Sequence, residues 1–167
     1  MNRRQVLKTG VTAAAISSVG LPQTAAWKPK VLSTEQNEAV IALTDLIIPA
    51  TDTPGAKAAN VNRYIDLFLS EMPAAERDRF FKGLKWLNEY STKEGGAAFS
   101  KLEPARQTAI LEKLDRGEDS LPEGNRFFRM AKSMTARFYY QTEIGFKELN
   151  KHGVPGGFGC KHDEHKP

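Results

Sequence analysis

The chain has 167 residues, of which 40% are hydrophobic and 26% are charged, and this length suits one domain with its own core. The composition excludes an intrinsically disordered chain, which would contain fewer apolar residues and carry a larger net charge. The formal net charge of +4 and the sequence pI of about 9.2 would suggest a nucleic-acid partner only if the basic residues belong to the mature protein.

The first 26 residues have the pattern of an export signal. Arg3 and Arg4 precede a mild apolar run at 10–21, which is shorter than the roughly 20 residues that span a bilayer. Small residues at 24 and 26 fit a signal-peptidase site, so we expect the mature protein to begin at Trp27. Removal of the signal leaves 21 basic against 20 acidic side chains, and we therefore expect no nucleic-acid partner.

This signal resembles the twin-arginine (Tat) type. The positions that match are Arg3, Arg4, Leu7 and Lys8. The sequence departs from the usual Tat pattern at Asn2 and Val6, so an ordinary Sec signal or an uncleaved N-terminal anchor stays open as the alternative. Because the Tat route carries folded proteins, this interpretation predicts a periplasmic protein that is exported with any cofactor-bearing partner attached.

The mature chain begins with a predicted helix at 34–48. Ser33 and Gln36 form a capping-box pattern at its start, and its apolar residues line one face. The following segment, 49–60, contains two prolines, a glycine and several short polar residues, which favours a structured loop. Functional residues often lie on such loops.

Three further helices are expected in the middle of the chain. Apolar residues repeat at helical spacing over 61–71, which predicts a well-buried helix there. Pro73 begins a helix that closes at two glycines, 95 and 96, and Pro104 begins another that closes at Gly117. We interpret 121–124 as a linker.

A single long helix is expected from 125 to Leu149, with the other helices packed on it. Its inward face is predicted to comprise Phe127, Ala131, Met134, Phe138, Gly145 and Leu149. Several glycines and Pro155 then give an extended tail from 152. No segment alternates long enough to indicate a strand, so we predict an all-α fold, with one compact domain of about five helices after the signal.

The residues offer little catalytic chemistry. A c-type haem needs two cysteines, and the chain has only Cys160, which also excludes an internal disulfide. No glycine motif sits between a strand and a helix where it would bind a nucleotide. Carboxylate pairs such as Glu112 and Asp115 lie among basic residues, as on a solvated face. We expect no catalytic residue, no cofactor site and no metal site in this chain.

The chain end is the one place where soft metal ligands gather. Cys160, His162 and His165 have the spacing C-x-H-x-x-H, with His152 as a further ligand. Metal binding is the weaker interpretation, because a terminus without flanking structure rarely pre-organises a site. In an exported protein Cys160 is either an idle thiol or the partner of a cysteine in another chain.

Three stretches together resemble the gluconate 2-dehydrogenase subunit 3 family, the small (gamma) subunit of membrane-associated, FAD-dependent sugar and sugar-acid dehydrogenases. They are L-T-D-L-I-I-P-A-T-D-T-P-G-A at 43–56, V-N-R-Y-I-D at 61–66, and the chain end, with Y-Y-Q-T-E-I-G-F-K-E-L at 139–149 and H-G-V-P-G-G-F-G-C-K-H at 152–162. The similarity covers roughly 34–162, and within 73–121 it extends only to helical character.

The resemblance implies a non-catalytic subunit. In such complexes a large FAD-dependent GMC-type dehydrogenase subunit carries FAD and the active site. A multi-haem cytochrome c subunit passes electrons to the respiratory chain. The small subunit supports folding and export of the large one, which implies a periplasmic location at the inner-membrane face, with membrane association only through the complex.

Within the loop at 49–60 the part at 49–56, together with the tail at 153–160, is the expected contact with the flavoprotein. The residues of both segments fix or permit unusual backbone geometry, and we expect that neither segment can bury itself. Phe158 is expected to be an apolar anchor, or alternatively to fold back on its own domain. The candidate partner-binding residues are Pro49, Thr53, Pro54, Gly55, Gly153, Pro155, Phe158 and Cys160. A free-standing periplasmic helical binding protein and a small metal-binding protein stay open as alternative functions.

Overall fold

The computed structural model describes residues 27–150, which form α-helices and one 3-10 turn (η1) and contain no strand. In chain order the elements are α1 (Thr34–Ile47), α2 (Val61–Glu71), α3 (Ala74–Gly95), η1 (Phe99–Lys101), α4 (Pro104–Arg116), α5 (Pro122–Gln141) and α6 (Glu143–Leu149). The predicted all-α, single-domain architecture is confirmed. None of the described helices combines the length and apolar character that a membrane span needs.

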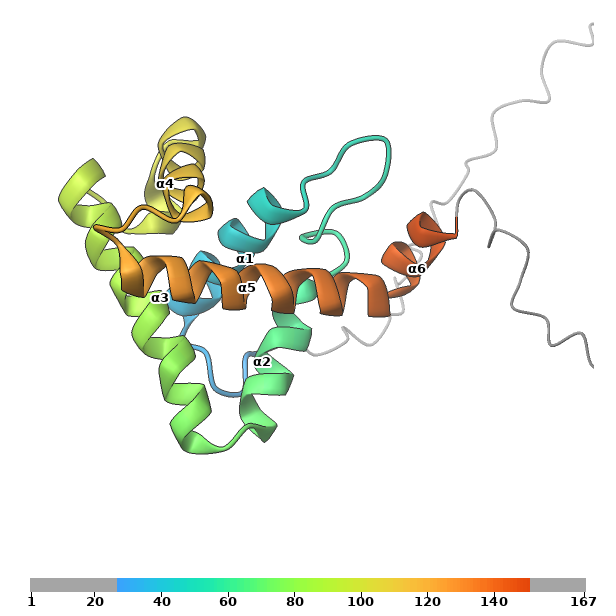
Figure 1. Cartoon of the computed structure of the whole chain (residues 1–167). Helices are drawn as coiled ribbons and strands as arrows, with labels where there is room; N and C mark the ends of the chain where they lie inside the picture. Colours follow the sequence, from blue (N-terminus) through green and yellow to red (C-terminus); the bar gives the residue numbers. More distant parts are fainter. Residues whose placement is uncertain (1–26, 151–167) are drawn as a thin grey trace, which may run out of the picture.

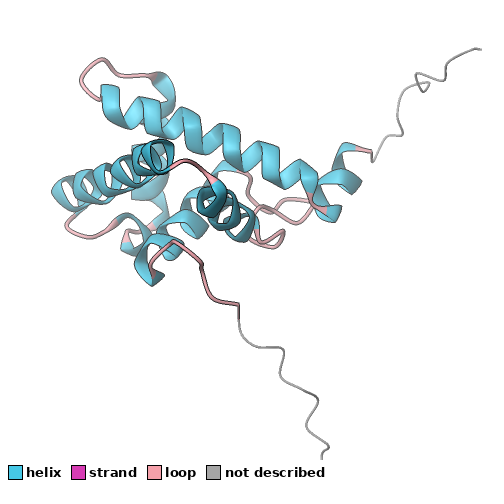
Figure 2. Cartoon of the chain, turned by 90° about the horizontal axis from the view of Figure 1, so that it is seen from below, coloured by secondary structure: helices cyan, strands magenta, loops and turns pink. Residues whose placement is uncertain are grey.

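Helix α5 is the centre of the domain. It contacts each of the other α-helices, and Figure 1 shows it crossing the middle of the molecule. In Figure 2 it runs along one side of the domain, with α6 at its end. Aromatic pairs connect it to its neighbours: the ring of Phe127 lies 5.5 Å from that of Phe80 on α3, and the ring of Phe138 lies 5.3 Å from that of Phe68 on α2. The expectation that the other helices pack on this segment is confirmed.

The prediction of one uninterrupted helix to Leu149 is wrong, because the chain turns at Thr142. This residue has extended backbone angles (φ −80°, ψ 158°) and caps both α5 and α6. Its hydroxyl donates to the Tyr139 carbonyl at 2.6 Å and accepts from the Gly145 N–H at 3.1 Å. A threonine side chain that satisfies free helix ends in this way competes with a continuous helix. Leu149 is consequently 65% exposed rather than part of the core.

Most of the other predicted boundaries agree with the structure. Ser33 and Gln36 form both bonds of the capping box, and α2 has the predicted bounds. Gly96 and Gly117 close their helices with positive φ values of 81° and 74°, a geometry that glycine adopts without a steric penalty. The expected linker at 121–124 is wrong in part, because Pro122 is already in the first turn of α5.

A buried carboxylate fixes the segment that leads into α1. Asp66 on α2 is 1% exposed and accepts three backbone N–H groups, from Lys30 at 2.6 Å, Val31 at 3.1 Å and Leu32 at 2.9 Å. The Arg63 guanidinium lies 5.2 Å from the ring centre of Trp27. The start of the described chain is therefore held against α2, a feature that the sequence pattern did not predict.

Candidate partner-binding surface

The loop at 49–60 is partly built into the domain. The Ala56 N–H donates to the Ile48 carbonyl at 2.8 Å, and Gly55 and Ala56 are buried. A Cβ on Gly55 would lie 2.5 Å from the Ala50 nitrogen and from the Ile48 oxygen, so only glycine fits this turn. The expectation that this loop cannot bury itself is therefore wrong for its second half. Its first half, with Pro49 and Pro54 exposed, remains available to a partner.

Tyr139 connects this loop to α6. Its side chain is fully buried, and its hydroxyl donates to the Pro54 carbonyl at 2.8 Å. The same hydroxyl contacts the Glu148 carboxylate on α6, and it interacts with the Thr53 side chain. Burial, followed by the Glu148 carboxylate, raises the pKa of Tyr139 to about 12. One phenol thus holds the loop and α6 in a fixed relation.

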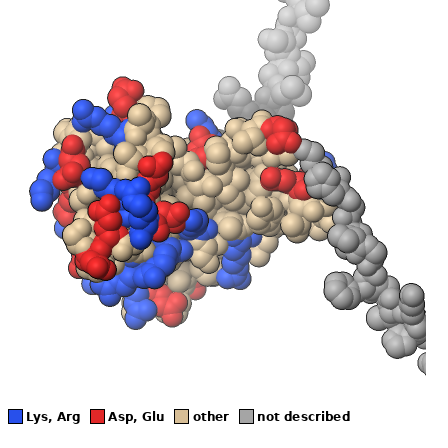
Figure 3. Space-filling model, turned by 45° about the horizontal axis from the view of Figure 1, so that its top comes forward, with Lys and Arg blue, Asp and Glu red and all other residues tan. Residues whose placement is uncertain are grey.

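Large apolar side chains are exposed next to this connection. Tyr140, Phe146 and Leu149 are 42%, 62% and 65% exposed. Together with Pro49 and Pro54 they define what we call the loop–α6 surface. On the face that Figure 3 shows, Lys, Arg, Asp and Glu crowd the end away from α6, whereas the half towards α6 is mostly uncharged apart from acidic side chains at its end. Exposed apolar residues in a region with few charges are typical of a protein-binding surface.

The candidate partner-binding residues in the loop differ in how far they are buried. Pro49 and Pro54 are exposed and Thr53 is half-buried, so these three can contact a partner, whereas Gly55 is buried and shapes the turn. The remaining candidates lie outside the described residues: Arg3, Arg4, Leu7, Lys8, Gly153, Pro155, Phe158 and Cys160. His152, His162 and His165, the other ligands of the considered metal site, also lie outside them. Within residues 27–150 no group of three or more His, Cys, Asp or Glu side chains could hold a metal ion.

The sequence interpretation missed the apolar half of this surface. Leu149 was assigned to the core, and Phe146 was not singled out. A signal for the surface was present, because Thr142 followed by Glu143 is a typical helix start. A new helix beginning there turns the residues after it away from the face that α5 buries.

The fold and this surface define a small helical protein with one end suited to binding another protein. The sequence matches the family described as Gluconate 2-dehydrogenase subunit 3 over residues 34–156, which is most of the chain. The chain belongs to this family, as the resemblance had indicated. The comparisons with curated proteins and with solved structures gave no match. The matched region includes every described helix, the loop at 49–60 and the first residues after α6.

Proposed function

We propose that this chain is the non-catalytic accessory subunit of a FAD-dependent dehydrogenase complex and that it binds the flavoprotein subunit through the loop–α6 surface. Membership of a family described as a dehydrogenase subunit supports the first part. The exposure of Tyr140, Phe146 and Leu149 beside a loop that Tyr139 holds in place supports the second.

The energetics of this surface favour a protein partner. Burial of one large apolar side chain contributes about 1.5–3 kcal/mol, and interface energy is concentrated in a few such anchors. Phe146 and Leu149 are three residues apart on α6, so their side chains share one face of the helix. Because Tyr139 already fixes the loop relative to α6, binding costs little conformational entropy there.

The proposal extends to export and assembly. The flavoprotein, with FAD bound, would cross the inner membrane by the Tat route while attached to this chain and its Arg3–Arg4 signal. Both would then lie at the periplasmic side of the membrane, with a multi-haem cytochrome c subunit as a third component. The tail from 152 would extend the contact through Phe158, and Cys160 would form an inter-subunit disulfide.

A pull-down tests the function directly. The tagged chain is isolated from its native periplasm, and the visible spectrum of the eluate is recorded before any gel. Flavin absorbance together with a large co-eluting chain supports the proposal, whereas a colourless single chain contradicts it and favours a free-standing binding protein. A non-reducing gel of the same eluate shows whether Cys160 links the chains.

The export component needs its own variant. Replacing both arginines of the signal, Arg3→Lys and Arg4→Lys, is expected to leave this chain and the flavin-bearing partner together in the cytoplasm. Lys8→Arg, which keeps the charge, is the control. If the partner still reaches the periplasm while this chain does not, the proposal that the two are exported together is wrong, even if the pull-down shows that they form a complex.

A further inference from the structure

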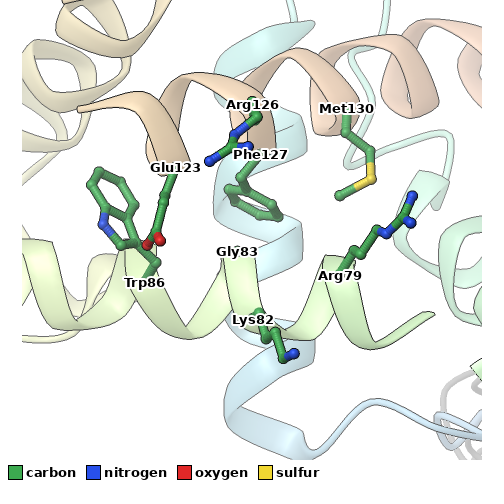
Figure 4. Close-up of a pocket in the computed structure, with 8 residues that line it drawn as sticks. All are labelled: Arg79, Lys82, Gly83, Trp86, Glu123, Arg126, Phe127 and Met130. Carbon is green, nitrogen blue, oxygen red and sulfur yellow. The ribbon is translucent and has the colours of Figure 1, made fainter. Parts of the chain in front are cut away.

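A pocket between α3 and α5 lies apart from the loop–α6 surface. It has a volume of about 510 Å³ and is lined by Arg79, Lys82, Gly83, Trp86, Glu123, Arg126, Phe127 and Met130. Figure 4 shows Arg79 rising from α3 and Arg126 descending from α5 on either side of the Phe127 ring. This volume is within the usual range of small-molecule sites, about 300–1,000 Å³.

The floor of the pocket is apolar and rigid. Phe127 is 3% exposed and packs against Phe80, and a Cβ added to Gly83 would lie 2.3 Å from the Phe127 ring. Trp86 forms one end wall, stacked on Tyr90 with ring centres 5.0 Å apart and planes 8° apart. An aromatic or aliphatic group would therefore meet a preformed surface rather than mobile side chains.

The rim carries an excess of positive charge. Arg79, Lys82 and Arg126 are exposed, and Glu123 is the only acid among the described residues that line the pocket. Within residues 27–150 no carboxylate forms an ion pair with any of these three cations. The Arg126 Nε donates to the Pro122 carbonyl at 3.2 Å, which leaves its other N–H groups available.

We propose that this pocket binds an amphipathic organic anion, with its carboxylate or phosphate between Arg79 and Arg126 and its apolar body over Phe127, Met130 and Trp86. Cations above an apolar floor complement such a molecule in both charge and hydrophobicity. A free fatty-acid-like amphiphile and the headgroup region of an anionic lipid share this chemistry. The proposal is independent of the accessory-subunit function.

The first experiment uses a matched pair of fluorescent probes on the full chain. Anilinonaphthalene sulfonate is an aromatic anion, and phenylnaphthylamine is its uncharged counterpart. The chain contains two tryptophans, and Trp27 lies in a different pocket with Arg63. The experiment therefore uses the Trp27→Phe variant, in which Trp86 is the only tryptophan and its fluorescence reports on this pocket. We expect the anion to bind more tightly than the neutral probe and to quench Trp86 by energy transfer.

Variants then test the charges. Arg126→Gln is expected to weaken binding of the anion about threefold, and Arg79→Gln with Arg126→Gln about tenfold, with little change for the neutral probe. Lys85→Gln is the control, because Lys85 is exposed on the same helix but lies outside the pocket and pairs with Glu89 at 3.6 Å. Equal binding of both probes, unchanged binding in the double variant, or binding without Trp86 quenching would overturn the proposal.

A further arm separates the two sources of the ligand. Displacement of the bound anion by monomeric laurate identifies a free amphiphile. A blue shift of Trp86 emission with phosphatidylglycerol vesicles, absent with phosphatidylcholine and lost in the double variant, identifies an anionic lipid. If neither occurs, no natural anion of this class fits the site and the proposal fails.

Discussion

The hydroxyl of Tyr139 donates to the carbonyl of Pro54 at 2.8 Å, across 85 residues of sequence, and the same oxygen contacts the Glu148 carboxylate. This single group connects the central helix, the proline loop and the final helix. The Tyr139 side chain is fully buried and both bonds are partly shielded from water, so solvent compensates only in part if the hydroxyl is removed. The shape of the loop–α6 surface therefore depends on Tyr139.

Tyr139→Phe keeps the ring but removes these bonds. We expect a loss of about 1–2 kcal/mol in the free energy of unfolding, because the Pro54 carbonyl loses its partner. Urea denaturation measures this loss. Tyr140→Phe, at an exposed neighbouring position, is the control and is expected to change the free energy by less than about 0.5 kcal/mol. Equal effects of the two substitutions would contradict the role assigned to Tyr139.

The raised pKa of Tyr139 predicts a dependence of stability on pH. The native state keeps this phenol protonated up to a pKa of about 12, whereas in the unfolded chain it ionises near the ordinary value of 10.0. The unfolded state therefore loses its proton first, so the contribution is fully present below pH 10 and is lost as the pH rises towards 12. The difference in unfolding free energy between the wild type and Tyr139→Phe, followed over this range, measures it. A difference that stays constant or grows with pH would contradict the assignment.

Asp66 is predicted to be the main attachment of the N-terminal segment. Asp66→Asn removes the charge and replaces one acceptor oxygen by a donor that faces backbone N–H groups. We expect a loss of about 2–3 kcal/mol, together with faster amide hydrogen exchange at Lys30, Val31 and Leu32. Asp78→Asn on the exposed side of α3 is the control. Unchanged exchange at the three amides would show that other contacts hold this segment.

Gly145 tests the corner between α5 and α6. A Cβ at this position would lie 2.1 Å from the Tyr139 carbonyl oxygen, and backbone cannot move aside as a side chain does. We expect Gly145→Ala to destabilise the fold by about 1–3 kcal/mol and to shift α6. Gly95→Ala is the matched control, because its new methyl meets only the flexible Leu102 side chain. If both substitutions are tolerated alike in urea denaturation, the corner is less constrained than the structure indicates.

Features with local causes were predictable from the sequence. The capping box at Ser33, the apolar spacing of α2 and the glycines that close α3 and α4 each depend on residues within a few positions of one another. The break at Thr142 was missed because no proline marks it, and the helical spacing continues through it. The bonds of Asp66 and Tyr139 were missed for another reason. Their partners are distant in the sequence, and a side chain's type does not reveal which far backbone group it will meet.

The candidate surface was therefore predicted only in part. The prolines and the glycine identified the loop, because proline restricts and glycine widens the backbone angles of its own position, whatever the rest of the fold is. The apolar half of the surface depends on the turn that directs Phe146 and Leu149 outward, which is a consequence of tertiary structure.

The most direct test of the central claim compares two double variants in the native pull-down. Phe146→Ser with Leu149→Ser removes apolar anchors on α6 that are 62% and 65% exposed, whereas Tyr64→Ser with Leu67→Ser removes apolar residues on α2 that are 41% and 47% exposed. Because all four side chains are exposed, both variants are expected to fold, and circular dichroism checks this. The account predicts that flavin recovered per tagged chain falls at least about tenfold in the α6 variant and stays at the wild-type level in the α2 variant. Equal flavin recovery in the two variants would show that the partner binds elsewhere.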